Sequence, residues 1–206
     1  MSTDIPASPQ LPVMEHFYTI QGEGYHQGRP AYFVRLGGCD VGCSWCDVKE
    51  SWHAEKHPLW NVDDIVAAVK NSGAEICVIT GGEPLMYDLT NLTAALHLHE
   101  IRTHVETSGA YPLTGGWDWV CVSPKRFKPA LGGCLEAANE LKVVIYHRND
   151  FRFAESYAEK VNPFCHLFLQ PEWSVEKEIL PLVIDYVKQN QKWSISVQVH
   201  KYMNIP

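Results

Sequence analysis

The sequence of 206 residues lacks long apolar runs, and none approaches the roughly 18 residues that a membrane-spanning helix needs. Its first fifteen residues lack the basic start and the apolar segment of a secretory signal. Positive charge is also scarce, and a net charge of −7 disfavours nucleic acid or an acidic membrane surface as the main partner. We therefore expect a cytoplasmic protein with no membrane partner and no nucleic-acid partner.

Cysteine occurs only seven times, and this odd number disfavours a disulfide framework. Cys39, Cys43 and Cys46 follow the spacing C-x3-C-x2-C within eight residues. A structural zinc site takes four ligands, whereas a cubane iron–sulfur cluster held by three cysteines leaves one iron open. The triad thus favours a cluster with one open iron. The remaining cysteines are interpreted as structural thiols: Cys77, Cys121, Cys134 and Cys165.

Two other interpretations of the cysteines remain open. A zinc- or cluster-binding module without enzymatic activity would need a fourth ligand, such as His53 or His57. A thioredoxin-like dithiol at Cys43 and Cys46 would normally follow a βαβ pattern, which does not precede this loop.

Apolar strand patterns alternate with helical patterns along the chain, which predicts a single α/β domain over residues 14–206 after a flexible tail over 1–13. A closed eight-stranded barrel typically takes about 250 residues. We therefore expect an incomplete, splayed barrel of about six or seven mostly parallel strands. Strands are predicted at 31–36, 76–80, 103–107, 119–122, 141–146, 166–169 and 194–199, and helices at 62–72, 89–99, 135–139, 150–161 and 174–189.

Polar and glycine-rich segments follow several of these strands. Functional loops of parallel α/β sheets lie beyond the carboxyl ends of the strands, so we expect these segments to form one site. Upstream, the glycines of 21–24 suggest a loop where backbone approaches a ligand closely. Arg35, near the end of the first predicted strand, is either an ordinary solvated or salt-bridged residue or, in an active-site mouth, a ligand for a carboxylate through its guanidinium fork. The segments after strands are the cysteine loop, 80–84 (TGGEP), 106–109 (ETSG), 123–125 (SPK) and 170–171 (QP).

The cysteine triad together with the later Gly-Gly-Glu-Pro resembles the radical S-adenosylmethionine superfamily. Gln-Gly-Glu-Gly upstream, Trp45 inside the triad, Glu-Thr-Ser-Gly, Ser-Pro-Lys and the terminal Gln-x-His-Lys-Tyr-x-Asn-Ile narrow the resemblance to the 7-carboxy-7-deazaguanine synthases. The similarity extends from about Glu15 to Pro206. It implies an incomplete TIM-like radical S-adenosylmethionine barrel. It also implies a lyase of queuosine biosynthesis that contracts 6-carboxy-5,6,7,8-tetrahydropterin to 7-carboxy-7-deazaguanine, with loss of ammonia.

The same resemblance implies cofactors, partners and site residues. Cys39, Cys43 and Cys46 would hold a [4Fe–4S] cluster whose open iron binds S-adenosylmethionine. A flavodoxin-type electron donor and a homodimer are the expected partners. The residues implied to bind S-adenosylmethionine are Trp45, Asp47, Gly81, Gly82, Glu83, Thr107, Ser108, Ser123, Pro124, Lys125, Gln170 and Pro171. The residues implied to bind the pterin are Ile20, Gln21, Gly22, Glu23, Arg35, Thr80, His200 and, through its α-carboxylate, Pro206.

One position departs from the family pattern. The family generally follows Cys-Asp with a threonine whose hydroxyl helps to hold Mg²⁺, but here Val48 follows Asp47 and offers no side-chain oxygen. Either substrate, water and Asp47 hold Mg²⁺, or another cation replaces it, or none is needed. A small activase of a glycyl-radical enzyme is the alternative function, since it shares the cysteine spacing. The Gln-Gly-Glu-Gly and terminal motifs are not expected in such an activase.

Overall fold

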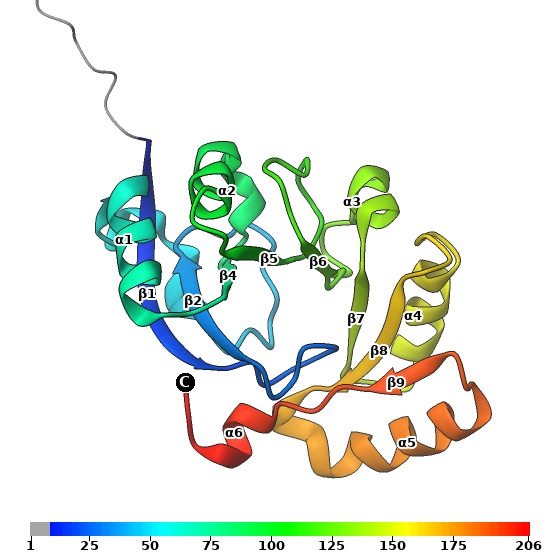
Figure 1. Ribbon diagram of the computed structural model, residues 1–206. Helices are drawn as coiled ribbons and strands as arrows, with labels where there is room; N and C mark the ends of the chain where they lie inside the picture. Colours follow the sequence, from blue (N-terminus) through cyan, green and yellow to red (C-terminus); the bar gives the residue numbers. More distant parts are fainter. Residues whose placement is uncertain (1–8) are drawn as a thin grey trace, which may run out of the picture.

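Nine strands of the computed structural model, which describes residues 9–206, form one sheet (Figure 1). Their order is β3-β1-β2-β4-β5-β6-β7-β8-β9, and β1 (Gln10–Ile20) is antiparallel to both of its neighbours. Every pair from β2 to β9 is parallel. The other strands are β2 (Pro30–Leu36), β3 (Leu59–Asn61), β4 (Ile76–Gly81), β5 (Arg102–Thr107), β6 (Trp119–Val122), β7 (Glu140–Ile145), β8 (His166–Pro171) and β9 (Trp193–Ile195).

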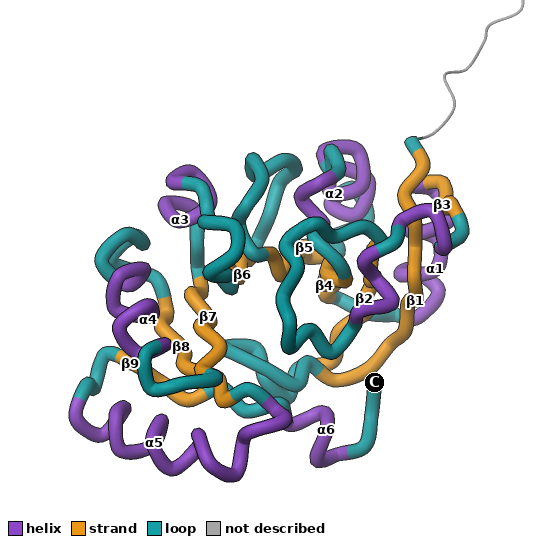
Figure 2. The backbone as a smooth tube through the Cα atoms, turned by 180° about the vertical axis from the view of Figure 1, so that it is seen from behind, coloured by secondary structure: helices purple, strands orange, loops and turns teal. Residues whose placement is uncertain are grey.

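Helices lie outside the curved sheet, while its concave side faces the middle of the molecule (Figure 1). The sheet order ends at β3 and β9, so the barrel is incomplete, as predicted. Seen from behind, long loops cross the space that the strands surround (Figure 2). No helix within residues 9–206 has the length and apolar character that crossing a membrane requires. The helices are α1 (Val62–Ser72), α2 (Thr90–His97), α3 (Gly132–Ala137), α4 (Asp150–Ala158), α5 (Glu176–Gln189) and α6 (Val199–Met203), with 3-10 turns at Lys49–Trp52, Ala54–Lys56, Pro84–Met86 and Trp173–Val175.

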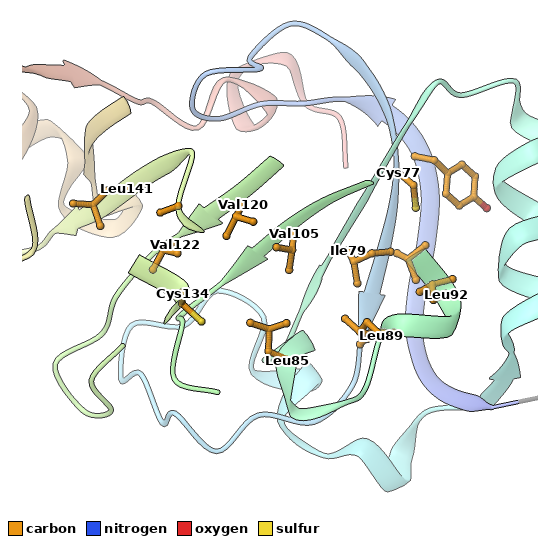
Figure 3. Packing of buried hydrophobic residues seen from close by; sticks show 14 of the residues in the cluster. Cys77, Ile79, Leu85, Leu89, Leu92, Val105, Val120, Val122, Cys134 and Leu141 are labelled. Atoms are coloured by element: carbon orange, nitrogen blue, oxygen red, sulfur yellow. The ribbon is translucent and has the colours of Figure 1, made fainter. Parts of the chain in front are cut away.

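Alternation along the strands separates the core from the site. Successive side chains of a strand point to opposite faces of the sheet. On β7, Leu141, Val143 and Ile145 join the large apolar cluster on the helix-covered side. Figure 3 shows this cluster, with Leu141 of β7 among its labelled members. Lys142 and Val144, between these residues, line a cavity on the other face. The strands therefore contribute apolar side chains to the core on one face of the sheet and polar side chains to the cavity on the other.

The N-terminal prediction is wrong in part. The expected flexible tail covered 1–13, of which residues 1–8 lie outside the described part of the chain. Gln10 already begins β1, and Leu11 and Val13 are buried. The prolines of this segment suggested a tail, but its alternate apolar residues pack into the core.

The predicted strand number is too low because two antiparallel elements escaped detection. β1 and β3 pair with each other at the open edge of the sheet and stand outside the strand–helix alternation. The last predicted strand, 194–199, is also too long. β9 covers Trp193–Ile195, and α6 begins at Val199.

Candidate active site

A cavity of about 250 Å³ lies at the carboxyl ends of the parallel strands and on the concave face of the sheet. All three cysteines of the triad line it. Every residue predicted to bind the pterin lines it too, as does every residue predicted to bind S-adenosylmethionine except Pro124 and Pro171. These two prolines are buried beside lining neighbours instead. Segments that are far apart in sequence thus meet at one site, while the roles of the individual residues remain predictions.

The cysteine loop is held at both of its flanks. The N–H of Gly38 donates to the carbonyl of Ser51 at 2.6 Å, and the N–H of Cys39 donates to Trp52 at 3.2 Å. The carboxylate of Asp40 accepts from the hydroxyl of Tyr111 at 2.6 Å and from Lys128 at 2.7 Å. These bonds present the three thiols to the cavity from one ordered loop.

The number of cysteines in the triad is that of a cluster with one open iron. Within residues 9–206, no group of three His, Cys, Asp or Glu side chains is close enough to hold one metal ion. A cubane places each thiolate on a different iron, so its ligands need not converge on one point. The two histidines proposed for a zinc site are engaged elsewhere, since His53 pairs with Glu55 and His57 with the carbonyl of Glu50. The zinc alternative therefore has no support in the geometry.

The cysteine thiols are free; Cys43 is buried, and Cys39 and Cys46 are half-buried. Burial raises the pKa of Cys39 and that of Cys43. Iron binding must therefore displace protons from these thiols, because thiolates are the ligands of the metal.

The two glycines of Thr-Gly-Gly-Glu-Pro are required by close backbone packing, which the sequence alone did not reveal. A Cβ on Gly82 would lie 2.2 Å from the carbonyl oxygen of Gly38, and one on Gly81 would lie 2.4 Å from backbone atoms of Leu36. The N–H of Glu83 donates to Gly38 at 2.9 Å. These glycines let the end of β4 approach the start of the cysteine loop. The prediction that they approach a cofactor remains a prediction.

Glu83 connects the ends of β4 and β5. Its buried carboxylate accepts from the N–H of Leu85 at 3.1 Å and from the hydroxyl of Thr107 at 2.5 Å. Its other oxygen accepts from the N–H and the hydroxyl of Ser108, at 2.8 and 2.5 Å. A carboxylate accepts about four hydrogen bonds, so the protein fills all of its positions. To bind a cofactor amino group, as predicted, one hydroxyl must rotate away from Glu83.

Lys125, in the loop after β6, lines the cavity. Its ammonium donates to the carbonyl and the hydroxyl of Ser123, at 2.7 and 2.6 Å, and lies 5.5 Å from the ring centre of Trp45. Burial lowers the pKa of Lys125. These contacts place a cation beside the ring that lies between Cys43 and Cys46.

Deeper in the concave face, one lysine joins two carboxylates. Lys142 of β7 is ion-paired with Glu23, and its ammonium lies 3.1 Å from Glu106 of β5. Gln198 donates to Glu23 at 2.8 Å, and Gln21 donates to Glu106 at 2.8 Å. Burial raises the pKa of Glu23, but the charge and hydrogen bond of Lys142, the hydrogen bond from Gln198 and the charge of His200 together lower it to about 2. Both carboxylates line the cavity, so the site presents acceptors there.

Arg35 presents an unused donor. One of its terminal nitrogens lies 3.2 Å from Glu15, and its guanidinium lies 5.3 Å from the ring centre of Phe17. Its Nε is buried without a hydrogen-bond partner. A buried donor left unpaired costs about 1–3 kcal/mol. A ligand carboxylate in the cavity would relieve that cost.

The C-terminal segment closes one side of the cavity. Lys201 of α6 lies 3.0 Å from Asp47, next to Cys46. The N–H of Val199 donates to the carbonyl of Gly22 at 3.0 Å, and a Cβ on Gly22 would lie 2.3 Å from the ring of His200. Pro206 lines the cavity. The terminus is therefore at the site rather than frayed.

The residues around Val48 provide no magnesium site of their own. Val48 lines the cavity with an apolar side chain, and the carboxylate of Asp47 is paired with Lys201. Ser51, the nearest hydroxyl along the chain, donates to the carbonyl of Val48 at 2.7 Å. The geometry thus agrees with the departure seen in the sequence.

Several lining residues were not predicted. Lys142 had a signal, because a lysine inside a strand buried on both faces is unusual and usually has a partner. Glu106 belongs to a motif that was noticed but not assigned. The sequence pattern does not distinguish the aromatic and apolar lining residues from residues of the hydrophobic core. The unpredicted lining residues are Phe17, Phe33, Val41, Ser51, Trp52, Glu106, Lys142, Val144, Glu172, Trp173 and Gln198.

Comparison with known proteins gives concordant results. Residues 33–130 match the family model described as the Radical SAM superfamily. The 7-carboxy-7-deazaguanine synthase of Flavobacterium psychrophilum is 57% identical over 95% of this chain and 93% of its own. The synthase of Synechocystis is 44% identical over 94% of this chain and 93% of its own. The synthase of Escherichia coli K12 is 33% identical over 95% of this chain and 99% of its own. The crystal structure of QueE from Escherichia coli superposes with a TM-score of 0.83 at 34% identity, covering 93% of this chain and 95% of that one.

Proposed function

The chain belongs to the 7-carboxy-7-deazaguanine synthases of the radical S-adenosylmethionine superfamily, and we propose that the cavity described above is where it performs their reaction. The enzyme contracts the ring of 6-carboxy-5,6,7,8-tetrahydropterin to 7-carboxy-7-deazaguanine, with loss of ammonia. The observation that carries the assignment of the site is the convergence of the cysteine triad and the predicted pterin-binding residues on one cavity. The glycyl-radical activase alternative is not favoured by these relatives.

Membership of this superfamily implies a [4Fe–4S] cluster and S-adenosylmethionine. In the proposal, Cys39, Cys43 and Cys46 hold the cluster, since their thiols are free and face the cavity. When bound, the two groups supply the radical chemistry that starts the reaction. The loops after β4, β5 and β6 surround the cofactor, with hydroxyls from Thr107, Ser108 and Ser123 and the backbone of Gly81–Gly82 at the cavity wall.

Three features of the chain recognise the pterin in the proposed arrangement. Arg35 binds its carboxylate, which supplies the acceptor that the buried Nε lacks. Glu23, ionised beside Lys142, accepts from the donor-rich aminopyrimidine edge. Thr80 and the 20–22 segment contact the ring system, and the α-carboxylate of Pro206 closes the site. Together these groups orient the substrate and exclude water, which is how positioning contributes to the rate.

Magnesium, the reductant and assembly are further parts of the proposal. Because the side chain of Val48 has no oxygen and Asp47 is paired with Lys201, the enzyme turns over without Mg²⁺. A flavodoxin-type protein supplies the electron, and the protein acts in the cytoplasm as a homodimer, as the family resemblance suggests.

An anaerobic assay tests this function. The reconstituted enzyme is incubated with 6-carboxytetrahydropterin, S-adenosylmethionine and a reductant, with and without Mg²⁺, and 7-carboxy-7-deazaguanine is quantified by mass spectrometry. We expect product at similar rates in both arms. Cys43→Ala is the matched negative control, and Cys165→Ala, which alters a cysteine outside the cavity, is the positive one. If no cation condition gives product, the function is refuted; a strict requirement for Mg²⁺ would refute only the magnesium part.

A further inference from the structure

The buried network around Lys142 connects three separate elements. Lys142 lies on β7, Glu106 on β5 and Glu23 in the loop between β1 and β2. The side chain of Lys142 is only 5% exposed, whereas those of Glu23 and Glu106 are 14% and 23% exposed. The lysine is therefore the most deeply buried member of the network, and all three side chains line the cavity.

Each carboxylate keeps acceptor positions for a ligand. Glu23 accepts one hydrogen bond on each oxygen, from Gln198 and from Lys142. Glu106 likewise accepts one on each oxygen, from Gln21 and from Lys142. An ionised carboxylate has about four acceptor positions, so roughly half remain free on each side chain. A ligand edge made of N–H groups is the complementary partner.

Two neighbouring carboxylates remain ionised only when a cation offsets their repulsion. Without one, a buried pair of this kind shares a proton, because like charges raise the pKa of one member. Here Glu106 and Glu23 outweigh the effect of burial and raise the pKa of Lys142, while Lys142 lowers that of Glu23. The other titratable groups that act on Lys142 or Glu23 are Glu140, Cys121, Lys125 and His200. Of all these groups, only Lys142 contacts both carboxylates.

We propose that Lys142 is a positioning residue that determines recognition of the pterin. Its ammonium keeps Glu23 charged and holds both carboxylates in place, so that Glu23 offers only acceptors to the aminopyrimidine edge. This inference rests on the proposed function and adds a residue that acts on recognition through the two carboxylates. A merely structural ion triad would contribute to folding without controlling substrate affinity.

The test uses steady-state kinetics of the reconstituted enzyme between pH 6 and 9. In Lys142→Met, the carboxylate pair takes up a proton, so we expect KM for the pterin to rise about tenfold or more near pH 7 while kcat stays within about threefold. KM should then fall as pH rises and the pair loses that proton, whereas the wild-type KM stays flat. Lys70→Met, on the exposed face of α1, is the matched control with wild-type kinetics.

The double variant Lys142→Met/Glu106→Gln separates charge from packing. Removing one of the two like charges lets Glu23 ionise again, so KM should return to within about threefold of wild type. This variant also carries the test if Lys142→Met does not fold. An unchanged KM in Lys142→Met, or a raised KM that Glu106→Gln fails to lower, overturns the inference while the function stands. Failure of the wild-type enzyme to form product overturns both.

Discussion

His104 is a buried histidine on the same side of β5 as Glu106, but at the opposite end of the strand from the cysteine loop. Its ring lies 4.6 Å from that of His26, and Trp119 is 6.3 Å away, measured between ring centres. Burial and the charges of His26 and Arg102 lower its pKa to about 3, against an opposing effect of Asp118. The folded protein thus keeps this ring neutral at pH values where the unfolded chain protonates it.

This difference predicts how stability depends on pH. Between the unfolded pKa of 6.5 and the folded value of about 3, the unfolded state binds more protons, so stability falls as pH falls. The slope from one such group approaches about 1.4 kcal/mol per pH unit. We expect the thermal midpoint of His104→Phe to fall less than that of the wild type as pH falls from 6.5 to 4.5. His99→Phe, at an exposed histidine, should keep the wild-type dependence; equal slopes in both variants would contradict the prediction.

At the scale of elements, α6 is a short helix that places the chain terminus in the site. Tyr202 donates to Glu176 of α5 at 2.6 Å, and Trp173 packs edge-on against Tyr202 at 5.4 Å between ring centres. After Met203, Asn204 adopts a left-handed conformation with φ of 54°. This turn directs the last two residues toward the cavity that Pro206 lines.

Extending the chain tests the role proposed for its terminus. A glycine appended after Pro206 moves the α-carboxylate away from its position at the cavity wall. We expect KM for the pterin to rise about tenfold, because a charged hydrogen bond is worth roughly 1.5–3 kcal/mol. Binding of S-adenosylmethionine, measured separately by calorimetry, should stay unchanged. An unaltered KM would exclude a substrate contact by the terminus.

The pair between Lys201 and Asp47 makes a smaller contribution. The side chain of Asp47 is 57% exposed, and exposed ion pairs are worth about 0.2–1 kcal/mol. Lys201→Met should therefore raise KM by no more than about fivefold and make α6 exchange its amide hydrogens faster. Lys188→Met, at a more exposed pair on α5, is the control. A loss of more than tenfold would mean that Lys201 itself contacts a ligand.

At the scale of the whole molecule, the sheet separates stability from function. Leu141 and Lys142 are neighbours on β7, yet Leu141 packs in the apolar cluster (Figure 3) and Lys142 lines the cavity. Leu141→Ala should lower the free energy of unfolding by about 2–5 kcal/mol through cavity formation. Its KM should stay at the wild-type value at temperatures where it is folded. A raised KM would show that the two faces are coupled.

Local patterns in the sequence were sufficient for the parallel part of the fold. Buried strands such as β4 appear as continuous apolar runs, and Gly73 ends α1 in the left-handed conformation that is typical of a helix C-cap, with φ of 74°. These signals depend on neighbours in the chain. The antiparallel β1 and β3 carry no such signal, because their pairing joins residues about 50 positions apart.

The sequence by itself determined the chemistry of this protein, because the cysteine spacing and the motifs at strand ends are local patterns. Nearly every residue that it assigned to the site lines one cavity. Only the tertiary structure decided which groups neutralise one another inside it. Lys142 lies 119 positions from Glu23 and 36 from Glu106, and no pattern along the chain connects them. Their pairing depends on the curvature of the sheet, which brings one face of several strands around a common space.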